Sequence, residues 1–367
     1  MSARGEMHMV LSVWLVLSSA LGSFSLPAVA AEQVCKECHE DKYTAPVGHY
    51  PSQEGLCEVC HTVEKRHFED MDPKAVTTQK SAQACYQCHE QKDQAKHVHP
   101  ALQMSEDSCI SCHNPHGGQH PTLLKQKLPT LCMDCHDSDS FTKGKSVHKI
   151  TSAGKSCARC HDSHSSSLPK MLTQKTEDIC FSCHNREVKT AERVIPNIKE
   201  KIEKSMSVHM VATECSECHS PHASQFDRLL SKQFSISDYT RYVHGDDTTA
   251  NTYELCFKCH DKGMMNRTID ADSTRFRKDS RNGVMLNRVN LHWVHVTNAT
   301  GTTGPDRGRS CKVCHDPHGA PQDRLIRNRM FKGNAKLEFQ VIKEGDNEVG
   351  GTCAKSCHSP KSYQRID

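Results

Sequence analysis

The chain has 367 residues, of which 35% are hydrophobic and 5% aromatic, and its mean hydropathy is −0.67. This is too little apolar material for a core closed by side chains alone, so another apolar group must supply part of the interior. The formal charge of +3 reflects 47 basic and 44 acidic residues, and no basic stretch is interleaved with aromatic residues, which argues against nucleic-acid binding.

The first 30 residues have the pattern of a secretory signal peptide: Arg4 precedes an apolar stretch at 10–21, and Ala28-Val29-Ala30 closes it. We expect cleavage after Ala30 and export to the periplasm, with the outer membrane or the cell exterior as further destinations. The residues before Cys35 lack the small residue of a lipoprotein signal, so no lipid anchor is expected. No later stretch approaches roughly 18 apolar residues, and no membrane span is expected.

Every cysteine belongs to one repeated motif. The chain reads CxxCH ten times and CxxxCH once, and these eleven motifs use all 22 cysteines. In chain order, motifs 1 to 11 are Cys35-Cys38-His39, Cys57-Cys60-His61, Cys85-Cys88-His89, Cys109-Cys112-His113, Cys132-Cys135-His136, Cys157-Cys160-His161, Cys180-Cys183-His184, Cys215-Cys218-His219, Cys256-Cys259-His260, Cys311-Cys314-His315 and Cys353-Cys357-His358. No thiol is left for a disulfide framework.

The spacing within the motif has a chemical reason. Two thiols about one helical turn apart can add to the two vinyl groups of one porphyrin, and the histidine that follows can reach its iron. A disulfide framework needs no histidine after every second cysteine, and zinc ribbons would use the motifs in pairs although eleven is odd. The sequence therefore predicts eleven covalently attached haem c groups, with the motif histidines as proximal ligands. The longer motif 11 leaves two alternatives, attachment through one or both sulfurs or a reduced pair without haem.

Four units repeat one plan: a leading histidine, a CxxCH motif, a second histidine, a Leu-containing spacer and a closing motif. They read CISCHNPH from Cys109, CARCHDSH from Cys157, CSECHSPH from Cys215 and CKVCHDPH from Cys311. This pattern resembles the multihaem c-type cytochromes with a doubled CxxCH motif, such as the cytochrome c3-like and decahaem conduit proteins, over nearly all of the chain after the signal. Ser163 in place of proline and the lengthened motif 11 are departures. The resemblance implies bis-histidine haems in close-packed pairs, in which the second histidine of a unit ligates a neighbouring haem.

The supply of histidines suffices for a second ligand on every iron. Of 26 histidines, eleven belong to motifs and His8 lies in the signal, which leaves fourteen. The predicted distal ligands are His49, His67, His97, His99, His116, His148, His164, His209, His222, His295 and His318. His120, His244 and His292 are in reserve, and the choice between His292 and His295 stays open. Methionine, the competing sixth ligand, is not expected because histidines are in excess.

The motif spacing predicts three parts after the signal. A haem-dense N-terminal part at 31–184 holds motifs 1 to 7, a helical linker follows at 185–210, and a C-terminal part with insertions at 211–367 holds motifs 8 to 11. In the linker, Pro196 is expected to open a helix whose apolar stripe, Ile198, Ile202 and Met206, continues to His209. The fold class expected is mostly irregular and organised by haem, with short α-helices and little β-structure.

Two stretches of the C-terminal part carry further expectations. The basic insertion at 263–309 is read as a solvated loop, with docking of an acidic partner or of haem propionates as the alternative. Residues 336–342 alternate like one short strand. Each porphyrin would bury several hundred Å² of apolar surface, worth on the order of 10 kcal/mol, so the chain without haem is expected to be disordered. Two propionates on each haem would make the loaded protein acidic.

These features predict electron transfer along the haems rather than enzyme catalysis, because two histidines saturate each iron. The expected partners are a quinol-linked or periplasmic cytochrome upstream and a cytochrome or reductase downstream, with an outer-membrane porin as a further candidate. The alternative is a nitrite, hydroxylamine or sulfur-oxyanion reductase with one five-coordinate haem, although no CxxCK site is present. A third interpretation is a scaffold in which haems are only structural.

Overall fold

The computed structural model describes residues 35–152, 157–235, 237–268, 274–298, 308–330, 335–353 and 357–366. The predicted signal peptide and residues 354–356 of motif 11 lie outside these ranges. Contacts divide the chain into two units, Met1–Ala84 with His113–Lys125, and Cys85–Cys112 with Gln126–Asp367.

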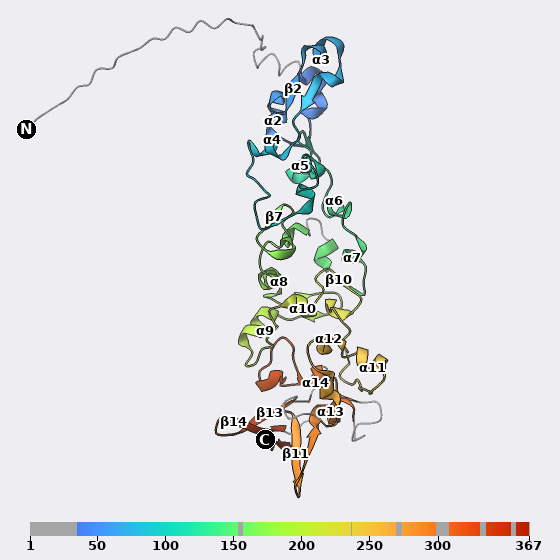
Figure 1. The fold of residues 1–367 in the computed structure, drawn as a ribbon, viewed down its shortest axis with the longest axis vertical. Helices are drawn as coiled ribbons and strands as arrows, with labels where there is room; N and C mark the ends of the chain where they lie inside the picture. The colour runs from blue at the N-terminus through green and yellow to red at the C-terminus, as the bar shows by residue number, and fades with distance from the viewer. Residues whose placement is uncertain are drawn as a thin grey trace, which may run out of the picture. The chain divides into compact units, whose positions relative to one another are not determined.

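Helices are short and separated by irregular chain (Figure 1), and α8 (Thr176–His184) is the longest α-helix among the described residues. The others are α2 (Tyr50–Gln53), α3 (Lys65–Asp70), α4 (Ala82–Tyr86), α5 (Ser108–Cys112), α6 (Thr130–Met133), α7 (Asp139–Thr142), α9 (Ile198–Lys204), α10 (Cys215–Cys218), α11 (Asp247–Asn251), α12 (Glu254–Phe257), α13 (Leu291–Val296) and α14 (Cys311–Cys314). Short 3-10 segments are η1 (Glu40–Lys42), η2 (Cys57–Val59), η3 (Pro73–Ala75), η4 (Pro100–Leu102), η5 (Pro121–Leu123), η6 (Lys149–Ser152), η7 (Cys157–Arg159), η8 (Pro169–Met171), η9 (Asp227–Leu229), η10 (Lys262–Met265) and η11 (Asp323–Leu325).

Strands are also short, and all described pairings are antiparallel. The first unit pairs β1 (Val47–Gly48) with β5 (Gly117–Gly118), and β2 (His61–Val63) with β3 (Val76–Thr78). The second pairs β4 (His97–Val98) with β7 (Ser165–Ser166), β6 (Ser146–Val147) with β10 (Ala223–Ser224), β8 (Val188–Lys189) with β9 (Val194–Ile195), and β11 (Arg277–Asn282) with β12 (Met285–Asn290). Its one three-stranded sheet within the described ranges is β13 (Phe339–Glu344), β14 (Asn347–Cys353) and β15 (Lys361–Gln364). The predicted fold class is confirmed.

The CxxCH motifs fold as single helical turns. In seven motifs, the backbone N–H of the histidine donates to the carbonyl of the first cysteine, four residues earlier, at 2.9–3.0 Å. This bond closes one α-helical turn and brings the two cysteines, three residues apart, to the same side of it. The motif therefore presents two sulfurs and an imidazole together before any distant residue is involved.

Short antiparallel ladders join segments that lie far apart in the sequence. β4, which leads into His99, pairs with β7, which follows His164, and the backbone N–H of His99 donates to the carbonyl of His164 at 2.8 Å. The same arrangement joins β6 and β10, where His148 donates to His222 at 2.8 Å. In each case, the histidine before one motif is anchored beside the histidine that follows a later motif.

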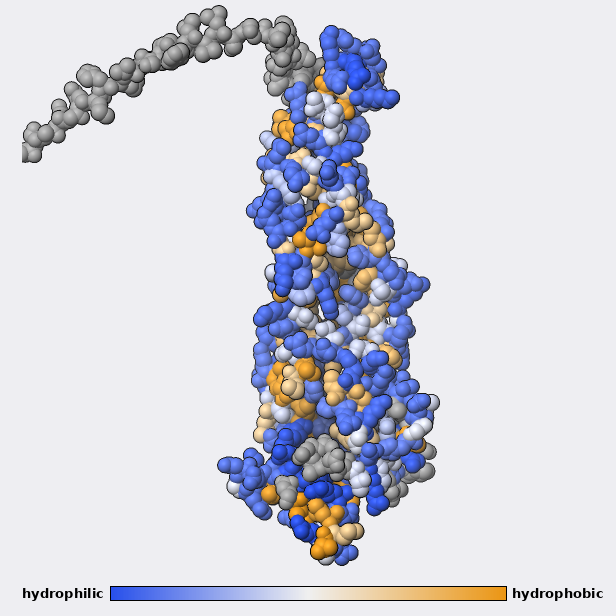
Figure 2. Space-filling view, viewed as in Figure 1, coloured by the Kyte–Doolittle hydropathy of each residue, from blue (hydrophilic) through white to orange (hydrophobic). Residues whose placement is uncertain are grey.

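Side chains form a core in only part of the chain. Between Ala75 and Leu230, no hydrophobic side chain of the described residues is buried, whereas Tyr242, Tyr253, Met265 and Val296 pack as one buried cluster farther on. Figure 2 shows hydrophilic residues over most of the visible face, with hydrophobic groups exposed between them. This absence of a side-chain core matches the composition, which calls for another apolar group in the interior.

Three local expectations need correction. The linker helix α9 begins at Ile198, capped by the Asn197 side chain, and ends at Lys204, so its stripe does not continue as helix to His209. The basic insertion is not a simple loop, because it contains the β11–β12 hairpin and α13, and its Arg277 is buried in an ion pair with Asp279 at 3.2 Å. The single strand expected at 336–342 begins at Phe339 and belongs to the three-stranded sheet.

Candidate haem sites

Among the described residues, nine motif histidines each lie opposite a second histidine. The ring centroids of each pair lie 5.8–6.5 Å apart. The pairs are His39–His67, His61–His116, His136–His99, His161–His222, His184–His148, His219–His318, His260–His209, His315–His292 and His358–His295. The motifs concerned are 1, 2 and 5 to 11.

This spacing fits an iron porphyrin held between two imidazoles. Each metal–nitrogen bond is about 2 Å and each ring centroid lies about 1 Å beyond its nitrogen, so two opposite axial ligands hold their centroids roughly 6 Å apart. Zinc would instead require three or four ligands in one cluster. No cluster of three or more His, Cys, Asp or Glu side chains suited to a bare metal ion occurs in the described residues.

The structure places the reserve histidines differently from one another. His292 lies opposite His315 with centroids 6.3 Å apart, and His295 lies opposite His358 at 6.5 Å, so both members of this pair face a motif histidine. The ring of His244 contacts the Met265 carbonyl through Nε2 at 2.8 Å. His120 precedes η5 and has an exposure intermediate between buried and exposed.

Among the described residues, His97 faces no motif histidine. It lies in β4, its Nε2 is buried, and this atom has no hydrogen-bond partner among the described residues. His99, two residues on, takes the place opposite His136 at 6.0 Å. The ring of His49 contacts the Pro115 carbonyl through Nδ1 at 2.7 Å, and the backbone N–H of His164 donates to Asp162 at 2.8 Å. The ligand roles of His49 and His164 stay predictions.

Burial keeps several of these imidazoles in the neutral form that binds iron. Desolvation lowers the pKa of His292 to about 3 and that of His318 to about 4. It also lowers the pKa of His219 and His315, against the opposing effect of a backbone hydrogen bond to each ring. These four side chains therefore offer a lone pair at neutral pH without first losing a proton.

Cysteines of consecutive motifs lie next to each other. The thiols of Cys132 and Cys157 share a hydrogen bond, as do Cys180 with Cys215, Cys256 with Cys311 and Cys35 with Cys57. Electrostatic contacts join Cys112 to Cys132, Cys160 to Cys183, Cys218 to Cys256 and Cys314 to Cys353. Motifs 1 and 2, and motifs 4 to 11, thus follow one another in space in sequence order.

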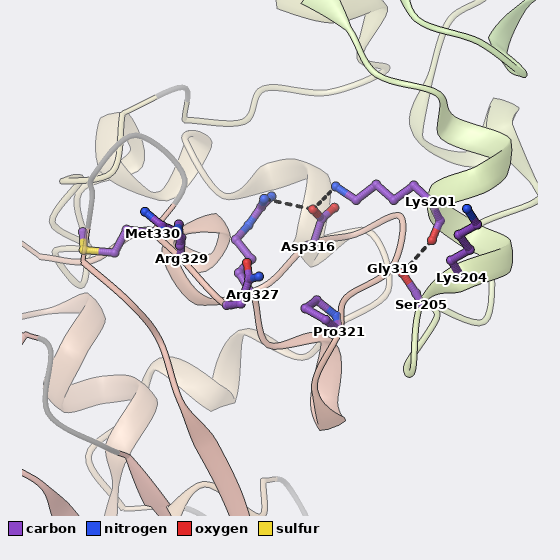
Figure 3. Close-up of a pocket in the computed structure, with 10 residues that line it drawn as sticks. Lys201, Lys204, Ser205, Asp316, Gly319, Pro321, Arg327, Arg329 and Met330 are labelled. Carbon is purple, nitrogen blue, oxygen red and sulfur yellow. Dashed lines mark hydrogen bonds and ion pairs between the residues drawn. The ribbon is translucent and has the colours of Figure 1, made fainter.

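A buried carboxylate, Asp316, directly follows motif 10 and lies between His315 of the motif and His318, the second histidine of the same unit. Asp316 accepts from the backbone N–H of His318 at 3.2 Å and forms ion pairs with Lys201 of α9 and, at 2.9 Å, with Arg327 (Figure 3). The three side chains border a cavity of about 440 Å³. A side chain at Gly319 would place its Cβ 2.6 Å from Ser205 Oγ, so glycine permits α9 to approach this closely. Sequence reasoning missed the ion pair between Lys201 and Asp316 because these two residues are 115 positions apart in the chain.

Motif 11 keeps the elements of a haem site despite its extra residue. Cys353 ends β14, Cys357 Sγ lies 3.7 Å from Met330 Sδ, and His358 faces His295. Both cysteines lie near Cys314 of motif 10, whose pKa is raised to about 12 by burial and then by these two thiols. Residues 354–356, which join the two cysteines, lie outside the described ranges.

Comparison with known proteins agrees with this geometry. The family model for the doubled CXXCH motif matches residues 99–141, 148–189 and 209–265. The chain is a multihaem c-type cytochrome with doubled CXXCH motifs, and its cofactor is covalently bound haem c.

A curated relative, the multiheme cytochrome MtrA of Shewanella baltica (strain OS185), is 28% identical over 117 residues. The match spans 30% of this chain and 34% of that protein, so the chain covers about a third of the relative's length. Among the described helices, none is long and apolar enough to cross a membrane.

Proposed function

We propose that this cytochrome conducts electrons along eleven haems, each held between two histidines and arranged in the order of the motifs. The observation that carries the proposal is the set of nine opposed histidine pairs with centroids 5.8–6.5 Å apart. Contacts between cysteines of consecutive motifs support the order, because thioether-linked porphyrins on adjacent cysteines must themselves be adjacent.

The proposed distal ligands differ from the sequence prediction at one position. His292 replaces His97, because α13 directs His292 toward His315 whereas His97 faces no motif histidine among the described residues. The complete set is His49, His67, His99, His116, His148, His164, His209, His222, His292, His295 and His318. The proximal set is that of the eleven motifs, with motif 11 included because His358 has its partner.

Haem held between two histidines would supply reversible one-electron transfer at an iron that needs no ligand exchange. The role of the polypeptide is to hold both imidazoles and to keep them neutral. The Nδ1–H groups of His161, His219 and His315 donate to backbone carbonyls at 2.8–3.0 Å, which fixes the tautomer that leaves Nε2 free for the metal. Such fixed, saturated sites favour electron transfer over substrate chemistry at the iron.

Export, partners and location complete the proposal. The signal-like N-terminus and the likeness to part of a multiheme cytochrome favour a periplasmic or outer-membrane-associated protein. We expect a quinol-linked or periplasmic cytochrome as donor and a cytochrome, reductase or extracellular acceptor downstream, with a porin as the candidate housing in an outer membrane.

Two measurements on the purified secreted protein test the proposal. Intact-mass spectrometry is expected to find eleven haems on one chain, and the dithionite-reduced protein is expected to bind almost no carbon monoxide. A mass that shows no porphyrin would refute haem attachment altogether. Binding of one or more equivalents of carbon monoxide would instead indicate an open iron and favour the reductase alternative.

A further inference from the structure

The spacer of each repeat unit contains two consecutive residues in the left-handed backbone conformation, and neither is glycine. They stand nine and ten residues after the motif histidine, with φ between 57° and 61°. The four dipeptides are Thr122-Leu123, Lys170-Met171, Arg228-Leu229 and Arg324-Leu325. Residues with side chains avoid this conformation, and two in succession are rarer still. Because this conformation recurs at the same place in all four units, we infer that it has a role in the structure of the unit.

The carbonyl of the first left-handed residue accepts a hydrogen bond from the proximal imidazole. The Nδ1 atoms of His113, His161, His219 and His315 lie 2.8, 2.8, 3.0 and 2.9 Å from the carbonyl oxygens of Thr122, Lys170, Arg228 and Arg324. A right-handed backbone would turn this carbonyl away from the ring. The unusual conformation therefore accounts for the bond in motifs 4, 6, 8 and 10.

The carbonyl of the second left-handed residue accepts a hydrogen bond from the backbone N–H of the residue that follows the same histidine. The N–H groups of Asn114, Asp162, Ser220 and Asp316 donate to the carbonyls of Leu123, Met171, Leu229 and Leu325 at 2.6–2.9 Å. Two residues farther along comes the second histidine of the unit. In three units it faces the proximal histidine of an earlier motif, as His116 faces His61, His222 faces His161 and His318 faces His219.

Motif 7 provides the contrast within the same chain. The Nδ1 of His184 is buried and has no hydrogen-bond partner among the described residues. A hydrogen bond from Nδ1–H to a carbonyl makes the imidazole a stronger donor to the metal, which stabilises the oxidised iron. Motifs with the left-handed dipeptide and motif 7 therefore differ in a property that sets reduction potential.

We propose that the left-handed dipeptides are positioning residues that lower the reduction potentials of the haems at motifs 4, 6, 8 and 10. The inference rests on the proposed function, since it requires the motif histidines to ligate iron. In the three units whose second histidine faces another motif histidine, the dipeptide also sets where the chain carrying that histidine starts, so it fixes one ligand of its own haem directly and one ligand of another haem through the backbone.

Lys170 is the position to test, because its side chain is exposed and only its backbone conformation is at issue. Lys170→Val introduces a β-branched side chain that resists positive φ, whereas Lys170→Gly adopts the left-handed conformation freely. Thr122, the β-branched residue found naturally at this place, donates its hydroxyl to the Pro121 carbonyl at 2.6 Å, which valine cannot do. The two variants remove the same side chain and differ in the conformation they favour.

Potentiometric titration followed by electron paramagnetic resonance is the readout. For Lys170→Val we expect one haem equivalent to become easier to reduce by roughly tenfold in its equilibrium constant, which is about 59 mV for one electron. Lys170→Gly is expected to titrate like the parent protein. The inference is overturned if both variants match the parent, or if both shift alike. Should Lys170→Val fail to fold, a shifted titration of the well-folded Lys170→Gly protein would still overturn it, and an unchanged one would support it.

The proposed function is checked separately in the same samples. An intact mass with eleven haems and low-spin signals from every haem in the parent protein would support bis-histidine ligation. Fewer haems or a high-spin signal in the parent would be a failure of the proposed function, not of the dipeptide's role.

Discussion

Neutralising Asp316, the buried carboxylate that follows motif 10, should destabilise the protein far more than the same change at the carboxylate that follows motif 6. Asp316 is 5% exposed in its side chain and faces Lys201 and Arg327, which are 31% and 17% exposed. Asp316→Asn keeps the oxygen that accepts from the His318 backbone, as Asn114 does naturally for His116 at 3.2 Å. It removes only the charge that two cations require.

The magnitude follows from leaving those cations without their counterion. Removing one partner of a buried ion pair typically costs 3–5 kcal/mol, and the partial exposure of Lys201 argues for the lower end, about 3 kcal/mol. Arg327 stays in place in the variant, because its Nε also donates to the carbonyls of Lys312 and His315 at 3.0 Å. For a unit of this size the cost corresponds to a fall in melting temperature of roughly 6–12 °C.

Thermal unfolding followed by circular dichroism in the Soret band is the assay, since it reports the surroundings of the haems. The matched control is Asp162→Asn, at the same place in motif 6, where the carboxylate is 45% exposed and accepts from the His164 backbone at 2.8 Å. We expect this control to cost less than about 0.5 kcal/mol. Equal melting temperatures for the two variants would refute the reasoning that Asp316 is held as a buried charge.

Three further predictions follow from the histidine pairs and from the location of the side-chain core. His292→Ala is expected to vacate one coordination position of a haem iron, so that the reduced protein binds one equivalent of carbon monoxide. His97→Ala is expected to bind none, and the reverse result would return His97 to the set of predicted ligands. A chain produced without haem attachment should show slow hydrogen exchange only beyond about residue 230, because the buried cluster of Tyr242 and Tyr253 lies there. Slow exchange across residues 85–229 would contradict the idea that haem supplies the interior of that part. The paired histidine rings cross at 69° and 65° in motifs 5 and 9 but only at 3–7° in motifs 1, 2 and 8. If these pairs ligate haem iron, electron paramagnetic resonance should show highly anisotropic low-spin signals from motifs 5 and 9 and rhombic signals from motifs 1, 2 and 8, and a spectrum with one signal type alone would count against these orientations.

The second ligands show where sequence reasoning stops. His292 and His295 are competing choices in the sequence, yet both face a motif histidine, because α13 places residues three apart on one side of a single helical turn. His97 and His99 also lie close together in the chain, and within the part that the structure describes only His99 lies opposite a motif histidine. Neither outcome follows from counting histidines.

The sequence by itself determined the class of cofactor, and it predicts the cysteines that attach it and the proximal ligands, because covalent attachment needs only residues within one helical turn. It also determined that the fold would be irregular, since a chain with so few apolar residues cannot close a continuous core of its own. Only the tertiary structure decided which distant histidine completes each opposed pair and which backbone carbonyl holds the proximal ring. Short antiparallel ladders between remote segments, β4 with β7 and β6 with β10, hold parts of the chain that carry these histidines, and no local pattern encodes which segments will pair.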